Sequence, residues 1–418
     1  MAIEDDVLVV GGGLAGATAA LAAAREGARV RLVSHKESTL RQATGLVDAL
    51  GAVDGSLVAD PFGAVRDLPE GHPYRTLGVD ALRAGLGLFD EVVEGYLGAH
   101  TDANALVPTH GGSVKPTARY PESVAPGLAS APDDTVLVGF ETLTDFDAPR
   151  AAAHLDRAGV PFDVRGVTLP FPADLRADAT VTRYADVLDE GVEGESDALS
   201  ALVESVKPHL GGAERVGFPA ILGHDEGPAV RRDLSDALDA AVFEVPMGPP
   251  SLPGMRLADQ LYRALDEAGV RIETGTPVVD ATSEDGRIET VTVEHVHTAV
   301  PYAAAQYVLA TGGLVGKGIG SGRGAVRERV FDCHVPHPED RYDWSAAAAY
   351  GDHAFARFGV VVDDEARPLD ATGAVEYANL RAAGGVVGGA DIAAEKSGSG
   401  VSLATGYTAG RLAGEEAT

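Results

Sequence analysis

The sequence predicts an α/β protein built on a parallel sheet, with a second α/β domain inserted into the first. Three observations support this prediction. A glycine-rich turn joins an apolar strand to a small-residue helix near the N-terminus, further strands and glycine turns fill the last third of the chain, and strand and helix patterns alternate between these regions. We expect residues 1–61 and 255–418 to form one discontinuous domain and residues 62–254 to form the insertion.

The N-terminal segment matches the dinucleotide fingerprint of Rossmann domains. An apolar strand at 7–10 precedes Gly11, Gly13 and Gly16, a helix at 17–26 follows, and a second strand covers 28–33. The first glycine permits a tight turn, the second lets the backbone approach a pyrophosphate, and the third lets helix and strand pack closely. The helix N-terminus, with Leu14 and Ala15, offers N–H groups to phosphate. We therefore predict a nucleotide site here, although a purely structural glycine turn is the alternative.

The acidic residue that normally binds the ribose hydroxyls after the second strand is missing. The strand ends in Ser34, His35 and Lys36, and Glu37 follows too far along. Ser34 can exchange a hydrogen bond with a hydroxyl group but supplies no carboxylate. This departure weakens a plain NAD or FAD interpretation and leaves room for a flavin mononucleotide.

Composition narrows the function further. The formal net charge is −30, and only five lysines accompany 28 arginines. Such a surface resembles that of proteins from salt-accumulating halophiles, although an acidic mesophilic protein is the alternative. Nucleic-acid binding and direct adsorption to an anionic membrane are disfavoured because both need basic patches.

Cysteine and histidine give no sign of a metal centre. Cys333 is the only cysteine, so no intrachain disulfide and no cysteine-held iron–sulfur cluster can form. The pairs His295/His297 and His334/His337 lack flanking ligands, and we predict no metal site. The apolar run 7–24 has the length of a membrane span, but it is rich in glycine and alanine and follows acidic residues. We therefore interpret it as the Rossmann strand and helix and expect a cytoplasmic protein.

The last third repeats nucleotide-type signals. We expect a helix at 255–268, strands at 270–273, 276–281, 287–296 and 299–302 with an Asp285-Gly286 hairpin turn, and a strand from Tyr307 that ends in Thr311 and Gly312. This order is typical of flavoprotein domains of the two-dinucleotide-binding type.

A final strand-end turn carries Gly389 and Asp391, and Gly400 and Val401 lie where the last helix opens. The aspartate could bind a ribityl hydroxyl, and the helix N-terminus could face the flavin N1/C2 region. A generic glycine-rich loop with a helix cap is the alternative.

The region between these signals reads as β/α units. We expect strands at 135–138, 161–169, 215–222 and 242–245, helices at 148–158, 198–210 and 225–240, and a solvated acidic loop at 189–197. The segment 246–254, rich in proline and glycine, is predicted to return to the first domain. The insertion would be a cap or a partner-binding domain.

In order and spacing, these motifs resemble the B subunit of anaerobic glycerol-3-phosphate dehydrogenase nearly from end to end. The serine after the second strand also fits this family. The matching residues are the turn at 11–16, His72-Pro73-Tyr74 with Leu77-Gly78, Pro249-Pro250-Ser251 with Gly254, Arg256-Leu257 and Gln260-Leu261, the segment 309–313, Phe358-Gly359-Val360 with Arg367-Pro368, Gly388-Gly389, and 398–401.

The resemblance implies a flavin-bearing subunit, commonly described with FMN, although FAD is the open alternative. It also implies a catalytic A subunit and an iron–sulfur C subunit, which would anchor the complex to the membrane. The complex would oxidise sn-glycerol 3-phosphate to dihydroxyacetone phosphate and pass electrons to the quinone pool.

The residues do not settle whether this chain performs the chemistry, which needs a base and a cationic phosphate pocket. His72 and His353 are candidates for the base, and Arg256, Arg323, Arg327 and Arg357 for phosphate binding. Each could instead have a packing or surface role. A stand-alone flavin dehydrogenase or oxidase of another small hydroxy or amino substrate, and a non-catalytic assembly subunit, remain alternatives.

Overall fold

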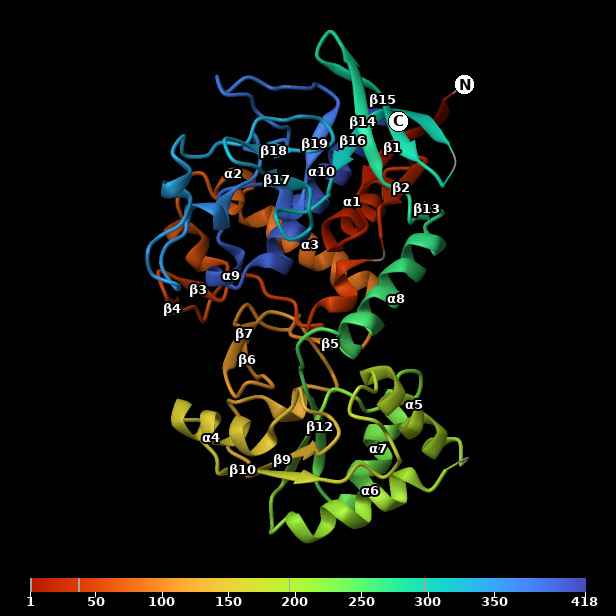
Figure 1. The fold of residues 1–418 in the computed structure, drawn as a ribbon, viewed down its shortest axis with the longest axis vertical. Helices are drawn as coiled ribbons and strands as arrows, with labels where there is room; N and C mark the ends of the chain where they lie inside the picture. Colours follow the sequence, from red (N-terminus) through yellow and green to blue (C-terminus); the bar gives the residue numbers. More distant parts are fainter. Residues whose placement is uncertain (1, 37, 195, 297) are drawn as a thin grey trace. The chain divides into compact units, whose positions relative to one another are not determined.

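The computed structural model describes residues 2–36, 38–194, 196–296 and 298–418. The chain folds into two compact units (Figure 1). Unit 1 comprises residues 1–39, 48–94 and 259–418, and unit 2 comprises residues 40–47 and 95–258. Glu37, Glu195 and His297 lie outside the described residues.

Unit 1 is built on a mixed sheet with the strand order β13-β2-β1-β16-β15-β14, and β19 also pairs with β16. Strands β13, β2, β1, β16 and β19 run parallel to one another, whereas β14 and β15 form an antiparallel meander with the first part of β16. The bounds are β1 (Ile3–Val10), β2 (Val30–Ser34), β13 (Arg271–Thr274), β14 (Val278–Glu284), β15 (Arg287–Glu294), β16 (Ala299–Leu309) and β19 (Leu380–Ala382).

The strand expected at 299–302 and the one expected to begin at Tyr307 form the single strand β16. Its first half alternates between exposed and covered positions, while Gln306 to Leu309 are buried on both faces. The change in burial along β16 is due to its neighbouring strands, because the first half pairs with the meander strand β15 and the second half lies between β1 and β19.

Helix α1 (Leu14–Arg25) packs closely on α10 (Gly398–Ala417) because glycines of α10 face alanines of α1. A Cβ atom at Gly406 would lie 2.6 Å from the carbonyl oxygen of Ala15, and one at Gly410 would lie 2.1 Å from that of Ala19. Such contacts leave no room for a side chain, so this small-residue seam fixes both helices in one position.

Residues 48–94 belong to unit 1, although the sequence placed 62–94 in the insertion. Helix α3 (Val79–Val92) packs on α10, and a Cβ at Gly85 would lie 2.5 Å from the carbonyl oxygen of Leu403. The remaining elements of unit 1 outside the sheet are α2 (Pro73–Leu77), α9 (Ile392–Glu395), the hairpins β3 (Ala52–Val53)/β4 (Ser56–Leu57) and β17 (Ile319–Ser321)/β18 (Val326–Glu328), and the 3₁₀ helices η2 (Gly63–Asp67), η5 (Arg341–Trp344), η6 (Ala354–Arg357) and η7 (Gly384–Val386).

Unit 2 contains a parallel sheet in the order β10-β9-β11-β12, which confirms β/α units in this region. A buried apolar cluster joins the sheet to its helices. Its strands are β9 (Thr135–Phe140), β10 (Val164–Leu169), β11 (Arg215–Pro219) and β12 (Ala241–Val245), and its helices are α4 (Ala148–Ala158), α5 (Val181–Val192), α6 (Ala198–Val206) and α7 (Gly227–Leu238). It also holds the pairs β5 (Tyr96–Leu97)/β8 (Tyr120–Pro121) and β6 (Ala105–Pro108)/β7 (Val114–Thr117), and the 3₁₀ helices η3 (Ala125–Gly127) and η4 (Lys207–His209).

Helix α8 (Leu252–Glu267) carries the chain from residues of unit 2 into residues of unit 1. The 3₁₀ helix η1 (Thr39–Gln42) marks the first passage along the chain, which runs the opposite way, from unit 1 into unit 2.

Two local expectations differ from the structure. The acidic stretch 189–197 is not all loop, because its first residues end α5, and the Asp189 carboxylate accepts hydrogen bonds from the N–H groups of His224, Asp225 and Glu226. The turn at 386–391 follows η7 rather than a strand, and the strand of that region is β19. In both places a tertiary partner, not local periodicity, decides the conformation.

Candidate functional site

A pocket of about 340 Å³ lies in unit 1 at the carboxyl ends of β1, β2 and β16 and the N-terminus of α1. Ligands of open α/β sheets bind at this edge. The pocket is lined by Val10, Gly11, Gly12, Gly13, Leu14, Ala15, Val33, Ser34, His35, Lys36, Ser38, Thr39, Pro277, Val278, Ala310, Thr311, Gly312, Gly316, Lys317, Gly318, Arg329, Val330, Gly384, Gly385 and Ser402.

The three fingerprint glycines have different surroundings. Gly11 has a φ of +123°, and a Cβ there would lie 2.1 Å from the carbonyl oxygen of Ala310. A Cβ at Gly16 would lie 1.9 Å from the carbonyl oxygen of Gly11. At Gly13 the nearest atom is the Thr39 hydroxyl oxygen at 3.4 Å, so this glycine leaves open space toward the pocket.

The N-terminus of α1 opens into this space. Gly13 is its N-cap and supplies no side chain to the first N–H groups of the helix, which have no acceptor within the helix. Leu14 and Ala15 line the pocket. Tyr262, on α8, donates a hydrogen bond of 3.1 Å to the carbonyl oxygen of Gly12 and thereby holds the turn. The arrangement suits an anionic group.

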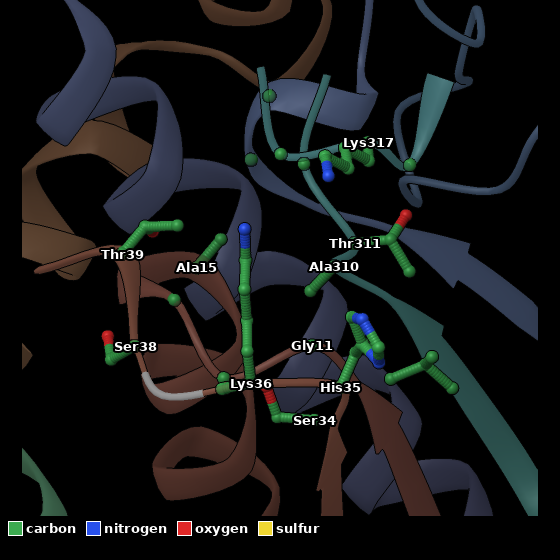
Figure 2. Close-up of a pocket in the computed structure, with 18 of the residues that line it drawn as sticks. Gly11, Ala15, Ser34, His35, Lys36, Ser38, Thr39, Ala310, Thr311 and Lys317 are labelled. Carbon is green, nitrogen blue, oxygen red and sulfur yellow. Dashed lines mark hydrogen bonds between the residues drawn. The ribbon is translucent and has the colours of Figure 1, made fainter. Parts of the chain in front are cut away.

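The pocket is cationic although the protein is strongly acidic. Lys36, Lys317 and Arg329 line it together with His35, and none of the lining residues that the structure describes is an aspartate or a glutamate. Two of the chain's five lysines are thus in one pocket. Figure 2 shows the Lys36 side chain extended across the pocket, with Lys317 across from Ser34 in this view.

Two hydroxyl groups complete the lining. The Thr311 hydroxyl oxygen is buried, and within the described part of the chain it has no hydrogen-bond partner. Ser34 is already engaged, because it donates to the carbonyl oxygen of Lys36 at 2.8 Å. An unpaired buried hydroxyl at a pocket wall costs free energy unless a ligand satisfies it. Together with the open face of Gly13, it fits a bound polar group that carries phosphate.

The structure brings seven of the residues predicted for the cofactor into this pocket, namely Gly11, Gly13, Leu14, Ala15, Ser34, Thr311 and Gly312. Gly16 lies behind the turn, where it has the packing role expected for the third glycine.

The other predicted cofactor residues are not in the pocket lining. A Cβ at Gly389 would lie 2.2 Å from the carbonyl oxygen of Gly71, and Gly400 donates its N–H to the carbonyl oxygen of Asp48 at 2.6 Å. Asp391 caps α9 by accepting from the N–H of Ala394, and Val401 is buried. From this end of the chain, Gly384, Gly385 and Ser402 line the pocket instead.

His72, a candidate base, is fully buried and engaged at both ring nitrogens. Its Nδ1 accepts the N–H of Tyr74 at 3.0 Å, so Nε2 carries the proton and donates to the Glu395 carboxylate at 3.1 Å. Burial by itself raises the pKa of Glu395, but the hydrogen bonds from His72 and Ser397 outweigh it and hold that pKa below its ordinary value. His72 therefore has a structural role in this conformation.

The other catalytic candidates also have local partners. The His353 ring accepts the N–H of Ala346, contacts the carbonyl oxygen of Ala349 at 3.1 Å and stacks on Phe355. Arg256, in unit 2, pairs with the buried Glu244 at 2.8 Å. Neither residue lines the pocket.

The other arginines predicted to bind phosphate lie in two different places in unit 1. Arg357 pairs with Asp352 at 2.6 Å. Arg323 and Arg327 lie on the β17–β18 hairpin, next to Arg329.

Sequence reasoning missed several lining residues, among them Lys36, Thr39, Lys317, Arg329 and Ser402. One signal could have found two of them: lysine is rare in this chain, yet Lys36 and Lys317 each stand next to a strand-end turn. Arg329 and Ser402 carry no local signal, because only the fold brings them to the glycine turn.

Cys333 and the residue types that bind metals form no second reactive site in the part of the chain that the structure describes. Burial raises the pKa of Cys333, which makes its thiol a poor nucleophile. In the described residues, no three histidine, cysteine, aspartate or glutamate side chains are placed to share a metal ion. None of the helices there has the length and apolarity to span a membrane, and the apolar run 7–24 forms β1 and α1.

The class of protein follows from this fold and from a family match. Residues 6–401 match the family model described as FAD binding domain, so the chain belongs to this family of flavoproteins. A solved structure of 3-ketosteroid-delta4-(5alpha)-dehydrogenase from Rhodococcus jostii RHA1 is similar over 99% of this chain and 97% of that chain, with 14% identity and a TM-score of 0.40.

Relatives define the family more closely. A Halobacterium salinarum protein, named as a probable B subunit of anaerobic glycerol-3-phosphate dehydrogenase, is 62% identical over 99% of both chains. A Pectobacterium atrosepticum protein, named as the B subunit of the same enzyme, is 30% identical over 95% of this chain and 96% of its own length. The chain belongs to the family of anaerobic glycerol-3-phosphate dehydrogenase B subunits, which confirms the resemblance found in the sequence.

Proposed function

We propose that this chain is the flavin-bearing B subunit of an anaerobic glycerol-3-phosphate dehydrogenase, an oxidoreductase. The complex oxidises sn-glycerol 3-phosphate to dihydroxyacetone phosphate, and the electrons pass toward the quinone pool. The observation that carries the proposal is the 62% identity, along the whole chain, to a protein of that name. The glycine-turn pocket supports the flavin part of it.

We propose FAD as the cofactor, since the matching family is described as an FAD binding domain. The preference for FMN drawn from the sequence has no support from that match. The N–H groups of Leu14 and Ala15 and the Lys36 ammonium are suited to hold phosphate, and Thr311 offers an unsatisfied hydroxyl. A bound flavin would supply a two-electron acceptor at this site.

The proposed partners are a catalytic A subunit and an iron–sulfur C subunit that attaches the complex to the membrane. The chemistry of this chain supports a need for partners. Its single cysteine cannot hold an iron–sulfur cluster, so the clusters of the proposed complex would have to lie on another chain. We propose the cytoplasm as its compartment and unit 2 as a cap or partner-binding domain.

Steady-state turnover with a quinone analogue tests the proposal. The chain is assayed alone and then co-expressed with the A and C subunits, and glycerol 3-phosphate should be oxidised much faster by the complex. Equal rates would mean that the chain is a stand-alone enzyme rather than part of a complex. A colourless purified protein would instead indicate an assembly subunit without cofactor.

Release of the flavin from the native protein, followed by chromatography and mass measurement, tests the cofactor by itself. Recovery of FAD supports the proposal, and recovery of FMN alone contradicts it whatever the complex oxidises.

A further inference from the structure

The exposed aromatic side chains of the described residues all fall in one segment of unit 1. The chain has eleven phenylalanines, eleven tyrosines and one tryptophan, and the exposed ones among those described are Tyr342, Tyr350 and Phe355. Tyr342 is 83% exposed and Tyr350 is fully exposed. Between these two tyrosines lie the four alanines 346–349, which are also exposed. Apolar side chains that are exposed together and bordered by polar residues mark surfaces that bind another molecule.

Helix α9 extends this apolar area. It contacts η6, the 3₁₀ helix that carries Phe355. Its residues Ile392, Ala393 and Ala394 are exposed. The two segments are distant in the sequence, so the fold brings their apolar side chains to one area. Residues 342–355 and 392–394 are called the apolar surface below.

The larger segment of the apolar surface is held in shape by its own side chains. The His353 ring accepts the N–H of Ala346 at 3.1 Å and contacts the carbonyl oxygen of Ala349 at the same distance. The Trp344 indole donates a hydrogen bond of 2.8 Å to the carbonyl oxygen of Pro338. A loop braced in this way presents its exposed side chains in one conformation, which lowers the entropy lost when a partner binds.

The charges in and next to this segment are mostly acidic. Glu339, Asp340, Asp343 and Asp352 are exposed, whereas the exposed basic residue of this stretch is Arg341. A second copy of the chain would bring the same acidic border, and another net charge of −30, against the apolar surface. An anionic membrane would be repelled in the same way. The surface therefore fits a different protein, with an apolar contact face that is bordered by lysine and arginine.

We propose that the apolar surface docks such a protein and that, resting on the proposed function, this protein is the catalytic A subunit. The A subunit has to pass electrons on within the complex, which requires a contact of fixed geometry. The proposed C subunit lies at the membrane, where anionic lipids repel an acidic border, so it fits this surface less well. The apolar surface belongs to unit 1 and leaves the proposed role of unit 2 unchanged.

The test uses the double variant Y342S/Y350S and the control V279S/V296S. Val279 and Val296 are also exposed residues of unit 1, but they belong to the antiparallel meander and its turn. A second variant, A347R, places a cation at an exposed alanine, where it would meet the basic border expected of the partner. If Y342S/Y350S fails to fold, A347R decides the test by itself.

Trp344 provides a direct measurement because it is the single tryptophan of the chain. A chain labelled with fluorotryptophan gives one fluorine NMR signal, and that signal comes from the apolar surface. The unlabelled A subunit is titrated into the labelled chain in about 1 M KCl, where a Debye length of about 3 Å leaves mainly direct contacts. The Kd for the A subunit, the flavin content and the melting temperature are compared among all variants.

We expect the signal of the unmodified chain to shift when the A subunit binds. The Kd should rise by at least about tenfold in Y342S/Y350S and in A347R, because a few buried aromatic side chains carry most of the affinity of an interface. Flavin content and melting temperature should stay unchanged, and V279S/V296S should bind as the unmodified chain does.

Other outcomes overturn the inference. It is wrong if the unmodified chain does not bind the A subunit, or if the variants bind it with an unchanged Kd. A dimer of this chain that Y342S/Y350S abolishes assigns the surface to a second copy, and loss of the C subunit alone assigns it to that partner. Failure of the proposed function looks different: the A subunit docks and the variants weaken it, but the unmodified complex does not oxidise glycerol 3-phosphate.

Discussion

Substitution of Gly13 separates binding from folding at the glycine turn. Gly13 has φ −79° and ψ −174°, an extended conformation open to any residue. A Cβ there would contact only the Thr39 hydroxyl oxygen, at 3.4 Å. Gly13→Val should therefore fold, but its side chain would occupy the space through which phosphate approaches the N-terminus of α1.

The expected magnitude follows from the hydrogen bonds that are lost. A phosphate kept away from the first helical N–H groups loses one or two charge-assisted hydrogen bonds, each worth about 1.5–3 kcal/mol. A loss of about 3 kcal/mol weakens flavin binding by about two orders of magnitude. Gly13→Ala, with a smaller side chain, should lose less.

Gly16→Ala provides the contrast, because its Cβ would lie 1.9 Å from the carbonyl oxygen of Gly11. Carbon–oxygen contacts are normally no closer than about 3.3 Å, so α1 would have to withdraw by roughly 1.4 Å. Overpacking of this kind costs about 1–3 kcal/mol or more. Gly16→Ala should lower the melting temperature by roughly 2–6 °C.

The assay combines visible absorbance of bound flavin with thermal unfolding by circular dichroism. Gly13→Val should melt near the unmodified protein and carry little flavin, whereas Gly16→Ala should lose stability first. A folded Gly13→Val protein with full flavin occupancy would refute the reasoning, and so would a Gly16→Ala protein of unchanged stability.

Three further predictions concern stability. Melting temperature should rise from dilute buffer to molar KCl, since the charge of −30 repels itself less when the Debye length falls from about 10 Å to about 3 Å; an unchanged or lower value contradicts a halophilic adaptation. The pKa of Glu395 is lower in the folded protein than the ordinary glutamate pKa of 4.5. Its charged form therefore stabilises the fold above pH 4.5, and this contribution to the free energy of unfolding is lost as the pH falls through the lower folded pKa. Glu395→Gln should therefore lower the free energy of unfolding at neutral pH by about 1–3 kcal/mol and match the unmodified protein under acid conditions, and a difference that persists there rejects this cause. Arg256→Met should destabilise the protein by about 3–5 kcal/mol, because Glu244 is 1% exposed and would be left buried without its cation. In denaturant titrations, the double variant Glu244→Gln/Arg256→Met should recover part of that loss. Full stability of the single variant would make Arg256 a candidate phosphate ligand again.

Local sequence predicted the part of the site that a short segment builds by itself. The sequence pattern of strand, turn and helix around Gly11, Gly13 and Gly16 lies within one short segment, so it is visible without the fold, although the closest contact of Gly11 is with the distant Ala310. The confirmed α/β class and family match follow from the same kind of signal.

Prediction failed where a residue's surroundings come from distant segments. His72 resembled a catalytic base in the sequence, but its ring is buried against Glu395, 323 residues away along the chain. The segment 62–94 carried no sign that α3 would pack on α10 through Gly85.

The sequence by itself determined the glycine turn, the net charge and the family. Only the tertiary structure decided that Lys36, Lys317 and Arg329 share one pocket and that Arg323 and Arg327 lie beside it. The physical reason is that backbone conformation responds to neighbours in the chain, whereas a charged pocket is made by strand ends and hairpins that become neighbours only when the sheet forms.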